Sequence, residues 1–194
     1  MLKTLSAALL VLVLTSCLPR PPLKTVADGF AGGSVSMRFV FRSGSDKQSG
    51  RLNWHYDEHQ ARLVVFGPIN QVVFELYVSR EQTTLVRRRG KLFWQGYFRD
   101  LMLALWGLNL SYGRIEDIFF SHRAGTGPDG LSIELTTRDD EVAAVVVRSA
   151  EGVLELKVLR HLRRAGVLIS RPDLRGYSRR SLEELTGSGE LADD

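Results

Sequence analysis

An apolar residue stands at every second position from Val35 to Phe41, with Ser34, Ser36, Arg38 and Arg42 between or beside them, and this period of two indicates a half-buried β-strand. Successive side chains of a strand point to opposite faces, so Val35, Met37 and Phe39 share the face that must be buried. The pattern returns, between polar or glycine-containing turns, over residues 52–56, 63–65, 72–78 and 83–94. We therefore expect five or six antiparallel strands before any helix.

The hydrophobic period changes to that of a helix between residues 96 and 120. Apolar residues with i, i+3 and i+4 spacing are Phe98, Leu101, Met102, Leu105 and Trp106. This spacing predicts one amphipathic helix that ends near Gly107. Residues 115–119 predict a shorter second helix with Glu116 and Asp117 near its start, where acids complement the helix dipole.

Alternation resumes over residues 131–135, 142–147 and 153–162, and a last short strand is expected over 167–169. The sequence thus predicts an α+β fold, one curved antiparallel sheet with helices inserted between its halves. Ser181 and Glu184 have capping-box spacing and predict one later helical turn. The expected organisation is a signal peptide over 1–16, a tether over 17–33, a sheet domain over 34–172 and a polar tail over 173–194.

A positive residue, an apolar run and a lone cysteine form the amino terminus. Lys3 precedes the run from Leu5 to Leu14, which has the length of the hydrophobic region of a signal peptide and not of a membrane-spanning helix. The segment from Leu14 to Cys17 resembles the bacterial lipobox, which implies a diacylglyceryl group on Cys17 and cleavage before it. The next residue is Leu18 and not the aspartate of inner-membrane retention, which implies a lipid-anchored, periplasm-facing protein of the outer membrane.

Composition and motifs exclude several classes of function. The 194 residues are 44% hydrophobic and 25% charged, as in one folded domain, and one cysteine allows neither an internal disulfide nor a cysteine-based metal site. His55 and His59 lie in a strand-turn-strand context without a third spaced ligand, so we expect no metal. The sequence has no G-x-S-x-G nucleophile elbow, and residues 125–130 lack the Gly-Lys-Ser/Thr that ends a phosphate-binding loop. We therefore expect no catalytic residue, no cofactor and no enzymatic activity. The export signal disfavours nucleic acid as a partner.

Basic residues are concentrated near the carboxyl terminus. Between Lys157 and Arg180 the chain has one acid, Asp173. The basic residues of this stretch are Lys157, Arg160, Arg163, Arg164, Arg171, Arg175, Arg179 and Arg180. This stretch could contact anionic lipid headgroups or an acidic carrier protein, or it could be a solvated face that the acids after residue 180 neutralise.

The order of motifs in the middle of the chain resembles the outer-membrane lipoprotein insertase family LolB and its periplasmic carrier relative LolA. The motifs are Gly50-Arg51-Leu52-Asn53-Trp54, the run from Arg62 to Asn70, the run from Leu101 to Gly107, and Ile115-Glu116-Asp117-Ile118. They cover roughly residues 35–122, while the last third of the chain matches only in its alternation.

The resemblance implies an open, unclosed antiparallel β-barrel with a helical lid, whose concave face receives the acyl chains of a lipoprotein. A LolB-like protein accepts lipoproteins from the periplasmic carrier and inserts them into the outer membrane without nucleotide. Its protruding membrane-insertion loop presents a leucine, and the matching residue is Ile69. Asn70 stands where the family usually has glycine, and asparagine tolerates a positive φ better than most residues.

Physical reasoning also favours lipid binding, because a helical insertion too small to fill the concave face leaves room for an apolar ligand. The residues expected to line this acyl-chain cavity are Phe39, Phe41, Trp54, Phe74, Leu76, Phe98, Leu101, Leu105 and Trp106. Two alternatives stay open: a carrier of another amphiphile such as a glycolipid, and a structural or assembly lipoprotein whose barrel is simply filled.

Overall fold

The computed structural model describes residues 32–127, 129–163 and 169–187. The predicted signal peptide, the predicted lipid-bearing Cys17 and the tether as far as residue 31 lie outside the described residues.

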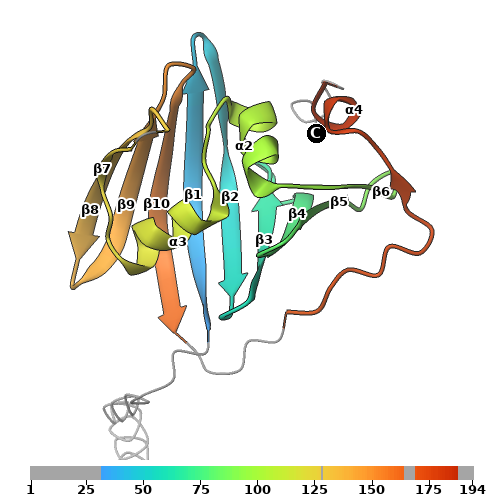
Figure 1. Ribbon diagram of the computed structural model, residues 1–194, viewed down its shortest axis with the longest axis horizontal. Helices are drawn as coiled ribbons and strands as arrows, with labels where there is room; N and C mark the ends of the chain where they lie inside the picture. The colour runs from blue at the N-terminus through green and yellow to red at the C-terminus, as the bar shows by residue number, and fades with distance from the viewer. Residues whose placement is uncertain (1–31, 128, 164–168, 188–194) are drawn as a thin grey trace, which may run out of the picture.

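Eleven strands build one sheet (Figure 1). They are β1 Gly33–Ser43, β2 Asp46–Tyr56, β3 Gln60–Phe66, β4 Val72–Ser79, β5 Thr83–Arg87, β6 Leu92–Gly96, β7 Gly125–Thr126, β8 Ser132–Arg138, β9 Glu141–Arg148, β10 Val153–Arg163 and β11 Ser178–Arg179. Their order across the sheet is β11-β6-β5-β4-β3-β2-β1-β10-β9-β8-β7, and only the β11–β6 pair is parallel. The end strands β11 and β7 do not meet, so the prediction of an α+β fold with an open antiparallel barrel is confirmed.

The alternation predicted for the first strand is present in β1, which lies between β2 and β10. Val35, Met37, Phe39 and Phe41 are at most 7% exposed, whereas the arginines between and after them are exposed. Between Ser36 and Met37 the register with β10 shifts, which is a β-bulge. One face of the central strands is therefore apolar and the other is polar.

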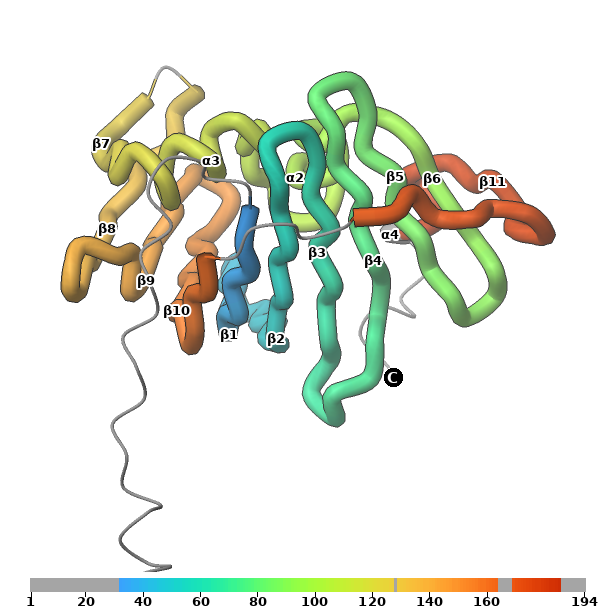
Figure 2. Tube along the Cα trace, turned by 90° about the horizontal axis from the view of Figure 1, so that it is seen from below, coloured from blue at the N-terminus to red at the C-terminus, as the bar shows by residue number. Residues whose placement is uncertain are grey.

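Two helices join β6 to β7 and cover the concave face of the sheet (Figures 1 and 2). Helix α2 spans Phe98–Trp106 and ends at Gly107, whose φ of 63° is a left-handed conformation that favours glycine. The predicted helical lid is thus confirmed. No helix among the described residues is both long enough and apolar enough to span a membrane.

Helix α3 spans Tyr112–Phe120 and begins earlier than its apolar pattern predicted. Its first turn is capped by the Ser111 hydroxyl, which accepts a hydrogen bond from the backbone N–H of Arg114. Glu116 and Asp117 consequently lie in the middle of the helix and not in its first turn. The prediction that these two acids complement the helix dipole was wrong.

The segment after Pro172 is packed more closely than a polar tail would be. β11 pairs with β6, and helix α4, Leu182–Gly187, contacts α2. Leu185 is 3% exposed and belongs to the hydrophobic core, with Leu182 packed against it. The prediction of a polar tail over 173–194 missed this contact, because two apolar side chains are too few to produce a periodic pattern.

Two further predictions concern this part of the chain. The capping box is confirmed: Ser181 N–H donates to Glu184 Oε2 at 2.8 Å, and Glu184 N–H donates to Ser181 Oγ at 3.2 Å. Of the strand expected over 167–169, only Ile169 is described, and it lies outside any strand. Its carbonyl instead accepts a hydrogen bond of 2.8 Å from Gln60 Nε2, which ties this segment to the β2–β3 turn.

One carboxylate is buried on the side of β4 opposite the concave face. Glu75 is 2% exposed, and it accepts hydrogen bonds from Arg62 Nη2 at 2.6 Å, Arg88 Nε at 2.5 Å and the Tyr77 hydroxyl at 2.9 Å. Burial by itself would raise the pKa of Glu75, but these hydrogen bonds outweigh burial and hold the pKa below its ordinary value of 4.5. The cluster joins β3, β4 and the β5–β6 turn.

Replacing Glu75 with Gln is expected to lower the free energy of unfolding by about 1–3 kcal/mol, because two guanidinium groups then face a neutral amide. Glu134→Gln is the matched control. Glu134 pairs with Arg148 while its side chain is 60% exposed, so its loss should cost less than about 1 kcal/mol. Urea unfolding measures both variants, and equal losses would contradict a structural role for the buried cluster.

The same carboxylate makes stability depend on pH. Because the folded-state pKa lies below the unfolded value, Glu75 stabilises the fold above about pH 4.5, and the contribution is lost as the pH falls through the folded pKa. The wild-type protein should therefore lose more stability than Glu75→Gln when the pH is lowered from about 6 to about 3. Parallel losses in urea titrations at several pH values would show that other groups control the acid sensitivity.

Candidate functional site

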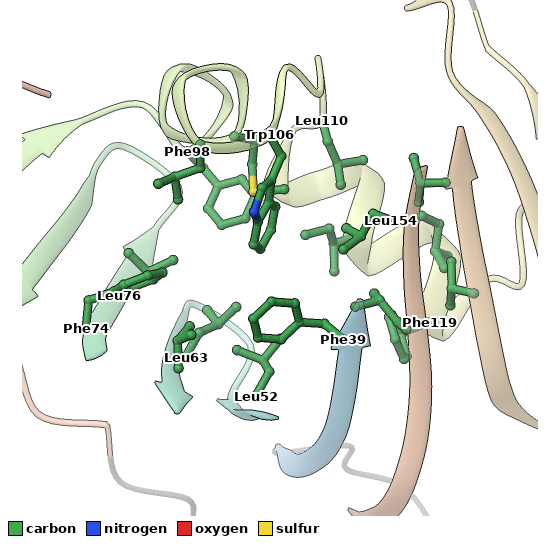
Figure 3. A pocket seen from close by; sticks show the side chains of 18 residues that line it. Phe39, Leu52, Leu63, Phe74, Leu76, Phe98, Trp106, Leu110, Phe119 and Leu154 are labelled. Carbon is green, nitrogen blue, oxygen red and sulfur yellow. The ribbon is translucent and has the colours of Figure 1, made fainter. Parts of the chain in front are cut away.

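A small apolar cavity lies between the concave face of the sheet and the two helices (Figure 3). Its lining side chains, all apolar, are Phe39, Leu52, Leu63, Val65, Phe74, Leu76, Phe98, Met102, Leu105, Trp106, Leu110, Ile115, Ile118, Phe119, Val145, Val147, Leu154 and Leu156. The cavity leaves about 50 Å³ for the centre of a water-sized sphere. A single water needs roughly 10–15 Å³ on this measure, so the cavity has no room for an acyl chain.

The cavity draws on both halves of the sheet because their registers bring distant strands together. β1 to β4 supply one side, β9 and β10 supply the other, and α2, α3 and the segment between them form the roof. Phe39 lies at the centre of this floor, on the strand that both halves share (Figure 3). A ligand in the cavity would therefore contact residues separated by more than a hundred positions in sequence, such as Phe39 and Leu154.

Trp106 forms the end of the roof, at the last residue of α2. Its ring lies 5.7 Å from that of Phe39 and 6.0 Å from that of Phe41, measured between centroids. The indole N–H donates to Gln48 Oε1 at 3.2 Å, and Gln48 is exposed on β2. The end of α2 is thus held by ring contacts and one solvent-accessible hydrogen bond.

Helix α3 is held to the sheet by an aromatic cluster around Trp54. Trp54 is 1% exposed, and its ring lies 5.3 Å from Phe119 and 6.2 Å from Tyr112, both in edge-on geometry. The indole N–H donates to the Tyr112 hydroxyl at 3.2 Å. Burial, with a smaller effect of the Glu116 charge, raises the pKa of Tyr112 well above its usual range, so this hydroxyl stays neutral.

Six of the nine residues expected in the cavity line it: Phe39, Phe74, Leu76, Phe98, Leu105 and Trp106. The other three are buried beside it. Phe41 packs against Trp106, Trp54 anchors α3, and Leu101 is fully buried in the core.

The twelve lining residues that sequence reasoning missed fall into three groups. The first, from α2, α3 and the segment between them, is Met102, Leu110, Ile115, Ile118 and Phe119. Leu52, Leu63 and Val65 share the concave face with the predicted residues, and their alternation could have identified them. Val145, Val147, Leu154 and Leu156 come from β9 and β10, and only the pairing of β10 with β1 brings them to the cavity. No local pattern reveals that pairing.

The loop between β3 and β4 presents Ile69 to solvent with 80% of its surface exposed. Asn70 has a φ of 66°, and its backbone N–H donates to the carbonyl of Gly67 at 3.0 Å, which closes a tight turn. Asparagine thus adopts the positive φ for which glycine is usual. Figure 2 shows this loop projecting on the side of the sheet away from α2 and α3.

His59 and His161 lie in structural settings. Asp57 Oδ1 accepts hydrogen bonds from the backbone N–H groups of His59 at 2.8 Å and Gln60 at 2.9 Å, as expected for a polar turn. His161 Nε2 lies 2.8 Å from the Tyr56 hydroxyl; burial lowers the pKa of His161 and raises that of Tyr56 to about 12. Within residues 32–127, 129–163 and 169–187, no three His, Cys, Asp or Glu side chains are grouped to hold a metal ion.

The family described as outer membrane lipoprotein LolB matches residues 34–117, somewhat less than half of the chain. This match confirms the predicted resemblance to LolB, and the matched segment spans β1 to β6, α2 and the Ile69 loop. Among solved structures, a LolA superfamily protein from Nitrosomonas europaea aligns with a TM-score of 0.48 and 4% identity, covering 72% of this chain and 89% of that one. A search of curated proteins found no significant match.

Tyr112→Phe should lower the free energy of unfolding by about 1–3 kcal/mol, because it leaves the buried indole N–H of Trp54 without an acceptor. Tyr97→Phe is the matched control, since Tyr97 is 70% exposed and should contribute less than about 0.5 kcal/mol. Urea unfolding provides the measurement. A loss as small for Tyr112→Phe as for the control would show that the hydrogen bond does not hold α3 in place.

Proposed function

We propose that this protein is a lipid-anchored lipoprotein of the outer membrane that receives the acyl chains of other lipoproteins in its apolar cavity and inserts these lipoproteins into the membrane. The observation that carries the proposal is the composition of the cavity. Eighteen apolar side chains and no polar ones line a space under two helices, in a chain whose residues 34–117 match the LolB family. Such a lining suits a hydrocarbon chain and offers nothing to a polar substrate.

Entry of an acyl chain requires the roof to move, because the cavity is too small. In this structure Phe98, Met102, Leu105 and Trp106 of α2 fill the concave face themselves. An acyl chain that takes their place keeps the apolar surface of the sheet away from water. Burying apolar surface contributes about 25 cal/mol per Å². Exchange of helix contacts for lipid contacts is thus nearly balanced in free energy, which allows capture and release without nucleotide hydrolysis.

The lipobox cysteine and the Ile69 loop supply the membrane side of the proposed function. A lipid group on Cys17 would keep the domain at the membrane, since each buried CH₂ of an acyl chain contributes about 0.8 kcal/mol. Ile69, exposed at the tip of its loop, would enter the lipid phase and open a path for the cargo. The donor of this cargo would be a soluble periplasmic carrier that also binds acyl chains.

The small volume of the cavity favours a second candidate function, a structural lipoprotein whose barrel is filled by its own helices. The two candidates differ in whether the roof opens for a ligand. Native mass spectrometry of the chain from residue 18 onward, mixed with a triacylated lipopeptide, tests this directly. All described elements lie between Gly33 and Gly187, so this truncation removes none of them.

We expect one-to-one capture of the lipopeptide and at least a tenfold loss of capture in Leu105→Glu, which places a charge at the cavity wall. Leu103→Glu is the matched control on the same helix, because Leu103 is 41% exposed and does not line the cavity. Thermal unfolding confirms that both variants fold. Absence of capture by the wild-type chain would favour the filled barrel, and preference for a glycolipid would indicate a different cargo.

Ile69→Glu should leave lipopeptide capture unchanged but reduce transfer of the captured lipopeptide to phospholipid vesicles at least tenfold. A charged side chain is costly to insert into hydrocarbon, by about 2.5–3.5 kcal/mol at the centre of a bilayer. Ile69→Leu keeps the apolar tip and serves as the control. The assay measures lipopeptide recovered with floated vesicles, and normal transfer by Ile69→Glu would remove the proposed role of the loop.

A further inference from the structure

Three basic residues lie side by side on the convex face of the sheet. The register pairs Arg38 on β1 with Lys157 on β10 and with Arg51 on β2. All three are exposed. Their neighbours Phe39, Leu52 and Leu156 line the cavity, so alternation directs the three basic side chains to the opposite face. We call Lys157, Arg38 and Arg51 the basic row.

No acidic residue neutralises the basic row within the described part of the chain, where none of its three members forms an ion pair. Glu155, two positions before Lys157 on the same face of β10, is bonded to Arg42. Like charges on directly opposed strand positions repel each other and cost stability. The row is therefore not explained by the fold, which would be at least as stable with neutral residues there.

The surroundings extend the positive surface. Arg160 and Lys47 are exposed on the same face of β10 and β2, and neither has an acidic partner among the described residues. The β-bulge in β10 adds Leu159, which is 48% exposed next to Arg160. An aliphatic side chain beside unpaired cations is the combination found at lipid interfaces.

We propose that this convex face docks on an anionic phospholipid surface. The position of the Ile69 loop favours a membrane over an acidic protein, because the loop projects on the side of the sheet away from the helices (Figure 2). The register and the alternation place the basic row on that same side. Lipid contact through the row would turn the loop tip toward the membrane and leave the helical roof facing the periplasm. The proposal rests on the proposed function only in placing the protein at a membrane.

Vesicle co-sedimentation of the chain from residue 18 onward tests the proposal, using vesicles of phosphatidylcholine alone and of phosphatidylcholine with phosphatidylglycerol. We expect at least tenfold tighter binding to the anionic vesicles, since each basic residue near an anionic surface adds on the order of 1 kcal/mol. The preference should weaken in high salt. Equal binding to both kinds of vesicle would overturn the proposal and leave the row for an acidic protein partner.

Arg38→Gln/Arg51→Gln/Lys157→Gln should abolish most of the preference for anionic vesicles. The control with the same change in charge is Arg80→Gln/Arg99→Gln/Arg138→Gln, at exposed positions outside the basic row, and it should retain the preference. An equal loss in both triple variants would mean that net charge alone is responsible and would contradict docking through this face.

Two readouts separate this proposal from the proposed function. The basic-row variant should capture lipopeptide as the wild-type chain does and should unfold at the same or a higher temperature. If the wild-type chain captures no lipopeptide but prefers anionic vesicles through the row, the proposed function fails and the docking surface stands. If the basic-row variant keeps full vesicle preference, the docking surface fails whatever the result of the capture experiment.

Discussion

A sheet whose edges do not meet has a concave face that no second sheet covers, and in this protein that face carries Phe39, Leu63, Leu76 and Leu154. Water contact with such a surface is unfavourable, so something apolar must lie on it. Helices α2 and α3 meet this requirement with their own apolar sides. The size of the cavity follows from how much of the concave face the two helices cover and fill.

The two helices are held in different ways. Helix α3 is anchored by Trp54 through three ring contacts, with Tyr112, Phe119 and Phe120, and a buried hydrogen bond to Tyr112. The end of α2 depends on Trp106, whose single hydrogen bond reaches an exposed glutamine. Breaking a hydrogen bond that water can replace costs little free energy, whereas leaving the buried indole N–H of Trp54 without an acceptor costs more. The hydrogen bond at the end of α2 is therefore easier for water to replace than the one that anchors α3.

The two faces of the central strands have separate roles in the proposed binding of acyl chains and the proposed docking on a membrane. The alternation that turns Phe39 into the cavity turns Arg38 outward, and the same holds for Leu52 with Arg51 and for Leu156 with Lys157. One β-strand can thus contribute to an apolar cargo site and a cationic membrane surface at neighbouring positions. The Glu75 cluster shows the contrast, because there the outward-facing charges are fully paired.

Local patterns in the sequence by themselves determined the strands before the helices, the helix ended by Gly107, the capping box at Ser181 and six of the nine expected cavity residues. Each depends on neighbours a few positions apart, through side-chain alternation, helical periodicity or backbone conformation. Only the tertiary structure decided that β10 pairs with β1, which brings Leu154 to the cavity and Lys157 beside Arg38. It also decided that Leu185 packs into the core and that the cavity is small, because strand pairing and packing between distant segments leave no periodic signal in the chain.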